Sequence, residues 1–212
     1  MKKIIILMVS IGSILVILGS CAKKDDAAST TSCATDTTAS GSITVGSETL
    51  SGVYISECNA SGFAANAGSS TFPSDVASGK SAVVVTGNTA LTQELLMYTD
   101  SSCSTPSLSY KNVRDNVTVG VASGSNYLVT YNADSLKIKP STAVAETHIE
   151  TFATNVGQSW ALTVGTESTF SDSGDLYMNL FLVTSTTITT GDEDKDTQPT
   201  AMDSMVMTKS CE

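Results

Sequence analysis

The chain has 212 residues, a formal net charge of −10 at pH 7 and a charged fraction of 15 %. An acidic chain with so few lysines and arginines makes nucleic acid and anionic lipid surfaces poor binding partners. Apolar residues make up 41 % of the chain, so a disordered chain is excluded and one domain with a core is expected.

The first twenty residues have the pattern of a secretion signal. Lys2 and Lys3 precede an apolar run from Ile4 to Leu18, and small residues follow that run. A membrane-spanning helix needs about 20 predominantly apolar residues, and this run is shorter. We therefore interpret residues 1–20 as a removable signal peptide, with a permanent transmembrane helix as the alternative.

The signal ends in Leu18-Gly19-Ser20-Cys21, which resembles the lipobox of bacterial lipoproteins. The resemblance implies cleavage before Cys21, acylation of that cysteine with palmitate-like chains, and a net charge near −12 once Lys2 and Lys3 are lost. Stable anchoring takes at least two acyl chains, each contributing about 0.8 kcal/mol per buried CH₂. In such lipoproteins an Asp after the lipidated cysteine retains the protein at the inner membrane. Ala22 stands there, so the resemblance implies the cell envelope and its outer membrane.

Residues 21–41 consist mainly of Lys, Asp, Ala, Thr and Ser, a composition that predicts a flexible, solvated tether. The folded domain is then expected over residues 42–212. Cys33 does not fit a free tether, which indicates that it is bonded elsewhere in the chain.

Cysteine usage predicts two disulfides. With Cys21 lipidated, an even number of cysteines remains in an oxidising compartment. They are Cys33, Cys58, Cys103 and Cys211. Of the three pairings that four cysteines allow, we favour Cys58–Cys103 together with Cys33–Cys211. A zinc site is the alternative, although the chain has no Cys-x-x-Cys spacing and a single histidine.

The start of the domain has the alternation of apolar and polar residues typical of strands, first at Ile43 and Val45 and then over residues 50–58. Its Gly52-Val53-Tyr54 core is similar to the Gly-x-Trp that opens the first strand of lipocalin-like barrels, with Tyr in place of Trp. Residues 59–79, rich in Asn, Ala, Ser and Gly, predict a long loop.

A hairpin is predicted over residues 81–86 and 90–99, because Gly87-Asn88 between them is a tight-turn dipeptide. The second strand ends in Tyr-x-Asp-x-x-Cys, from Tyr98 to Cys103. This pattern resembles one in barrel-like secreted bacterial proteins, where the cysteine pairs with one near the first strand. The resemblance therefore implies the Cys58–Cys103 pairing.

The remaining segments predict more short strands around one helix. Ala145, Ile149, Phe152 and Val156 recur at helical spacing, so residues 141–156 predict an amphipathic helix, begun by Ser141 or Thr142 and stopped by Gly157. A further strand there is the alternative. An acidic loop is expected over residues 191–202. The other predicted strands are 108–111, 117–121, 127–131, 136–138, 160–164, 176–183, 184–190 and 205–207.

Together these elements predict a mainly β fold, an antiparallel meander that closes into a barrel or a sandwich, with one helix packed outside. The resemblance at Gly52-Val53-Tyr54 implies the first of these, a lipocalin-like barrel. Two functions follow as hypotheses. In the first, the barrel holds a small apolar molecule, with Tyr54 and Trp160 as ligand-lining residues. In the second, the protein is a structural or surface lipoprotein of the envelope that acts through protein partners and holds no ligand.

No catalytic, metal or cofactor site is predicted. Asp192, Asp194 and Asp196 alternate as in a calcium loop, but Thr197 stands at the position of the turn glycine and no helices flank the run, so a solvated loop is favoured. His148 lies beside the apolar stripe of the predicted helix without a nucleophile motif, which favours a structural role. We therefore expect no enzyme. The large aromatic residues are expected mainly in the core.

Overall fold

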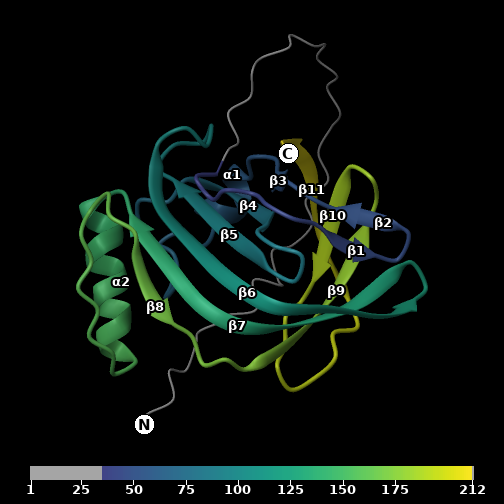
Figure 1. Ribbon diagram of the computed structural model, residues 1–212. Helices are drawn as coiled ribbons and strands as arrows, with labels where there is room; N and C mark the ends of the chain where they lie inside the picture. Colours follow the sequence, from purple (N-terminus) through teal and green to yellow (C-terminus); the bar gives the residue numbers. More distant parts are fainter. Residues whose placement is uncertain (1–34, 212) are drawn as a thin grey trace.

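The computed structural model describes residues 35–211, and Figure 1 shows their arrangement. The predicted signal peptide 1–20 and the lipidation site Cys21 lie outside these residues. Two helices and eleven strands follow one another in the order β1 (Ile43–Val45), β2 (Glu48–Leu50), β3 (Val53–Ser56), α1 (Ala60–Ala64), β4 (Ser78–Val85), β5 (Leu91–Tyr98), β6 (Pro106–Ser123), β7 (Asn126–Pro140), α2 (Ala143–Asn155), β8 (Ser168–Ser171), β9 (Leu176–Val183), β10 (Thr187–Gly191) and β11 (Met202–Cys211).

The strands of the large sheet ring round. Nine strands pair in the order β6-β5-β4-β3-β11-β10-β9-β7-β8, and β6 pairs with β7 as well. The pairings therefore return from β7 to β6, and every neighbouring pair is antiparallel. The expectation of a mainly β, antiparallel meander is confirmed, with β8 beside β7 as a ninth strand.

The register fixes which side chains point into the ring. Gln93 pairs with Val83 and Asn112, and Tyr131 pairs with Tyr177. Residues paired directly across antiparallel strands share a face of the sheet, and alternate residues of a strand share one too. Along β5 the inward positions are therefore Leu91, Gln93, Leu95 and Met97, a polar residue between apolar ones.

Two apolar clusters lie on either side of that polar level. The hairpin-side cluster lies next to the β1–β2 hairpin, and its buried members are Ile43, Val45, Leu50, Tyr54, Val83, Val85, Leu91, Val117, Val129, Tyr131, Ala133, Tyr177, Phe181, Ile188 and Met207. The helix-side cluster lies next to α1 and α2, and its buried members are Phe63, Phe72, Val76, Leu95, Met97, Leu108, Ile138, Ala145, Ile149 and Leu162.

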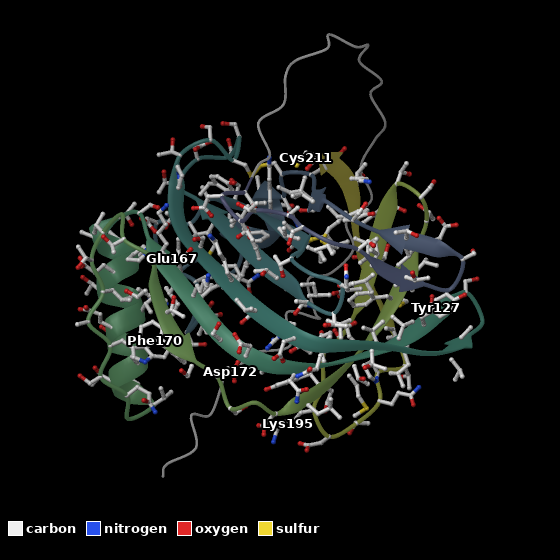
Figure 2. The ribbon with its side chains drawn as sticks, in the orientation of Figure 1. Tyr127, Glu167, Phe170, Asp172, Lys195 and Cys211 are labelled. Atoms are coloured by element: carbon white, nitrogen blue, oxygen red, sulfur yellow. A yellow bond between two sulfur atoms is a disulfide. The ribbon has the colours of Figure 1, made fainter. Side chains whose placement is uncertain are left out.

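The β1–β2 hairpin packs directly on the ring. A Cβ added to Gly46, whose φ is +63°, would lie 2.0 Å from the Tyr127 hydroxyl of β7, so only glycine allows this approach. Ile43 and Leu50 pair across the hairpin and are buried in the hairpin-side cluster. Figure 1 shows the hairpin on the opposite side of the molecule from α2, and Figure 2 labels Tyr127 close to it.

The predicted helix is confirmed and the alternative of a strand there is wrong. The Thr142 hydroxyl accepts a hydrogen bond from Ala145 N at 3.1 Å, and Gly157 follows the helix with a φ of +76°. These are an N-cap and a left-handed stop. The buried residues are Ala145, Ile149 and Ala153, an i, i+4 stripe one position from the predicted Phe152.

The strand boundaries differ from the predicted ones around β6 and β7. Residues 108–111 and 117–121 lie in the single strand β6, and residues 127–131 and 136–138 lie in β7. The polar residues between these segments lie at shifts in the β6–β7 register and do not form turns. Asn116, with a φ of +51°, lies within one of these shifts. Bulges of this kind let a long strand bend around the ring while its pairing continues.

Residues 160–164 were predicted as a strand and form none. Leu162 N donates a hydrogen bond to Glu150 Oε1 of α2 at 2.8 Å, and the Trp160 ring stacks on Phe170 at 4.5 Å between centroids. Leu162 is therefore buried and Trp160 half-buried against the helix and β8 instead of pairing in the sheet, while Val164 is exposed. The predicted loop 59–79 contains α1 and the start of β4.

Candidate functional site

The cysteines within the described residues are bonded. Cys58 and Cys103 form a disulfide with an S–S distance of 2.10 Å and a Cα–Cα distance of 5.9 Å. This is the pair that the Tyr-x-Asp-x-x-Cys resemblance implied. Cys211 is disulfide-bonded as well. Cys33 lies outside the part of the chain that the structure describes, so the Cys33–Cys211 pairing stays a prediction.

The two candidate ligand-lining residues do not lie together. Tyr54 is fully buried in the hairpin-side cluster, inside the ring. Trp160 is half-buried at the border of the helix-side cluster, where it contacts Phe170. The structure therefore places Tyr54 in one cluster and Trp160 at the border of the other, and it does not bring the two residues to one site.

The other residues weighed as sites have structural partners. His148 Nε2 lies 3.2 Å from the Ser70 carbonyl oxygen, which links α2 to the loop before β4. The Asp194 carboxylate accepts hydrogen bonds from the backbone N–H groups of Asp196 and Thr197, at 2.7 and 2.9 Å. Within residues 35–211, no three His, Cys, Asp or Glu side chains are grouped in a way that could hold a metal ion.

The strongest concentration of polar groups lies inside the ring, around Arg114, the only arginine of the chain. Its side chain is 0 % exposed, and Nη2 lies 2.7 Å from Glu193 Oε1. Nη1 lies 3.7 Å from Asp172 Oδ2, whose side chain is also 0 % exposed. The guanidinium further sits over the rings of Tyr131 and Tyr177, at 5.5 and 5.1 Å from the centroids. A buried cation is thus held by two carboxylates and two aromatic faces.

Amide and phenol groups extend this cluster across the ring. The Tyr131 hydroxyl donates to Glu193 Oε2 at 2.7 Å and accepts from Asn179 Nδ2 at 3.2 Å and Gln93 Nε2 at 3.3 Å. Arg114 Nε donates to Gln93 Oε1 at 3.3 Å. We call these residues, together with Asp172, the Arg114 layer. It separates the two apolar clusters, because Gln93 lies between Leu91 and Leu95 on the inward face of β5.

Burial governs the electrostatics of the Arg114 layer. It raises the pKa of Glu193, and the charge of Arg114 and the Tyr131 hydrogen bond oppose the rise only in part. Burial also raises the pKa of Tyr131, and it raises that of Tyr177 to about 12 with help from the charge of Asp172. Both phenols are therefore neutral at physiological pH, so Tyr131 acts as a hydrogen-bond donor to Glu193.

The layer has the chemistry of a structural network. A buried ion pair is stable only when hydrogen bonds satisfy the charges around it, and it then specifies one arrangement of the surrounding elements. Arg114 of β6, Glu193 after β10 and Asp172 after β8 come from distant parts of the chain. The network therefore ties these three segments together, and the sequence reasoning missed it. A lone arginine inside a strand-forming stretch was the available signal.

A second charged cluster lies on the outer face of the ring. Lys111 of β6 pairs with Glu94 of β5 and with Lys137 of β7 in the register, so the three side chains form a row. Asp36 contacts the Lys111 ammonium, and Glu167 Oε2 lies 2.7 Å from it. Two acids that are far apart in the sequence, Asp36 and Glu167, therefore converge on one buried lysine.

No protein-family model matches the chain, and no curated protein matches it. Among the helices of residues 35–211, none has the length and apolar character needed to cross a membrane.

Proposed function

We propose that the protein is a lipid-anchored lipoprotein of the bacterial cell envelope, held in the outer membrane through Cys21. In this proposal its domain is a lipocalin-like barrel with a filled interior. It acts through contacts of its outer surface with protein partners, and neither catalysis nor carriage of a small molecule is its role. This is the second of the two functions that the sequence suggested.

The packing of the ring interior carries this proposal. A side chain that lined a void wide enough for a water molecule would retain exposed surface. Arg114, Tyr54 and Tyr131 are 0 % exposed and project into the ring from three different strands. Leu50, Val85, Leu91, Val129, Ala133, Ile138 and Ile188 have no exposed surface either, whereas Gln93 at the middle level of the ring is partly exposed.

The Arg114 layer weighs further against a small apolar ligand at the centre of the ring. A carrier pocket for such a molecule is mostly apolar with few polar groups. Here the middle of the ring carries an ion pair and its hydrogen bonds. An apolar molecule placed there would remove these partners, and leaving a charge buried without them costs about 3–5 kcal/mol.

The acidic character of the chain fits a body that stands away from the membrane. The net charge of −10 repels an anionic lipid surface, so attachment has to come from the acyl chains. The Cys58–Cys103 disulfide agrees with an oxidising compartment outside the cytoplasm.

Metabolic labelling with a palmitate analogue tests the anchor. The full chain, produced in a bacterium that processes lipoproteins, is expected to incorporate the label and to lose its first twenty residues. Cys21→Ser is the matched variant, and it is expected to remain unlabelled while the domain folds. An unmodified chain that still carries residues 1–20 would contradict the anchor.

A further inference from the structure

Residues 35–41 cross the outer face of the ring and are attached to it at two places. At one end the Asp36 carboxylate contacts Lys111 and lies 3.3 Å from Lys139 Nζ. At the other end Ser40 N donates to the Val85 carbonyl oxygen at 2.8 Å. These residues precede the β1–β2 hairpin, and we call them the strap.

The strap covers a carboxylate that the fold does not satisfy. Glu94 is 3 % exposed; within residues 35–211 no group meets strict hydrogen-bond geometry with its oxygens, and the hydroxyls of Thr37 and Thr35 make only looser contacts with it. Burial raises the pKa of the Glu94 carboxylate. The hydroxyls of Thr37 and Thr35 and the ammonium of Lys111 lower it, but they offset the rise only in part. Burial without well-formed hydrogen bonds disfavours the charged carboxylate, so Glu94 disfavours the closed position of the strap.

Asp36 acts in the opposite direction. Partial burial raises its pKa, but the hydrogen bonds and charges of Lys111 and Lys139 outweigh burial and hold the pKa below its usual value. The charged form of Asp36 is therefore favoured when the strap is closed. Asp36 is 57 % exposed, so salt can screen this attraction.

We propose that residues 35–41 form a releasable strap, which Asp36 holds closed on Lys111 and Lys139 and which the buried Glu94 carboxylate beneath it works to open. Opening bares Glu94 of β5 and Lys111 of β6 on the outer face, beside Lys137 of β7, whose side chain is already 37 % exposed. The strap thus controls access to a charged surface. The predicted Cys33–Cys211 disulfide would keep the strap near the domain, so that opening is local and reversible.

The charged groups around the strap give it a two-phase pH dependence. Besides Asp36 and Glu94, the cluster contains Lys111, Lys137, Lys139 and Glu167, with Tyr98 beside Glu94. Glu94 penalises the closed strap at pH values above its raised pKa, so acidification first removes this penalty and tightens the strap. The attraction of Asp36 is lost only when the pH falls through its lowered pKa, below 3.8, and the strap then loosens.

Hydrogen exchange of the strap amides, measured by mass spectrometry on the full chain and divided by the intrinsic rates, tests the proposal. Asp36→Asn is expected to speed exchange of residues 35–41 by about two- to fivefold, the range for a largely exposed ion pair. Glu94→Gln is expected to slow it, because it removes the buried charge and keeps the shape. Asp196→Asn is the matched control: its carboxylate lies 3.8 Å from Lys195 Nζ in the acidic loop, and strap exchange should not change.

The opposite signs of the two variants distinguish a releasable strap from a merely structural contact. If Asp36→Asn changes strap exchange no more than Asp196→Asn, or if Glu94→Gln speeds exchange, the proposal is wrong. The unmodified chain supplies a second measurement, since its strap exchange should slow and then rise again as the pH is lowered. A steady rise throughout would contradict the role of Glu94. None of these readouts depends on lipid at Cys21.

Discussion

Arg114 Nη2 of β6 lies 2.7 Å from Glu193 Oε1, inside the ring of strands and between its two apolar clusters. Glu193 follows β10, which does not pair with β6. The ion pair therefore fastens segments that the backbone ladder does not join. It also occupies the middle level of the ring, between Leu91 and Leu95 of β5.

Glu193→Gln is expected to destabilise the domain by about 3 kcal/mol, because it removes the carboxylate charge that lies 2.7 Å from the buried Arg114 guanidinium. Chemical denaturation measures this loss, and Asp196→Asn in the exposed acidic loop is the control, with a change within about 0.5 kcal/mol. Adding Arg114→Met and Asp172→Asn to Glu193→Gln should recover part of the loss, since neither Arg114 nor its buried partner Asp172 then leaves an uncompensated charge. If Glu193→Gln and the control are equally stable, the Arg114 layer does not hold the ring together.

The disulfide prediction concerns Cys58, Cys103, Cys33 and Cys211. Non-reducing peptide mapping of the mature protein is expected to find Cys58 linked to Cys103 and Cys33 linked to Cys211. Replacing Cys58 and Cys103 together by serine should cost about 2–5 kcal/mol, because the bond closes a loop with a sequence separation of 45. A free thiol at Cys33 would show that the predicted Cys33–Cys211 disulfide, on the N-terminal side of the strap, does not form.

Asp203 of β11 gives a prediction for pH. Burial, and then the charge of Asp192, raise the pKa of Asp203 to about 6. Its charged form is therefore disfavoured in the folded state, and this penalty appears as the pH rises from 3.8 through about 6. Asp203→Asn should melt at a higher temperature than the unmodified protein at pH 8 and at the same temperature at pH 4. A difference in melting temperature that is the same at both pH values would exclude this explanation.

Gly79 of β4 tests how α1 packs on the ring. A Cβ at this position would lie 1.9 Å from Cε1 of Phe63, a buried residue of α1. Gly79→Ala should therefore displace the Phe63 ring and cost about 1–3 kcal/mol in denaturant unfolding. Gly87→Ala is a suitable comparison, because its nearest atom, the Ala90 Cβ, is 3.3 Å away. Equal stability of the two variants would mean that Phe63 does not occupy this position in solution.

The sequence predicted the elements whose signals are local. Helical spacing with Thr142 before it identified α2, and Gly87-Asn88 identified the β4–β5 hairpin, since both depend on residues a few positions apart. The strand prediction at residues 160–164 was wrong. Apolar alternation indicates that side chains are buried, but it does not distinguish pairing in a sheet from packing against a helix. There the partner is α2, through Glu150.

The charged clusters could not be predicted from sequence, because their members meet only through the ring. Asp36 and Lys111 are separated by 75 positions, and Arg114 and Glu193 by 79. The composition of residues 21–41 predicts a solvated tether. In such a tether Asp36 would be a solvated charge without a partner in the folded domain. Its partners on β6 and β7 become neighbours once those strands pair.

Native mass spectrometry of the protein extracted in detergent from its own host tests the central claim most directly. We expect one species whose mass equals the chain from Cys21 onward with two disulfides and its acyl chains. Stronger activation should release no additional molecule. A small apolar compound that leaves the protein on activation, in a one-to-one ratio with the chain, would show that the ring carries a ligand and would contradict a filled interior.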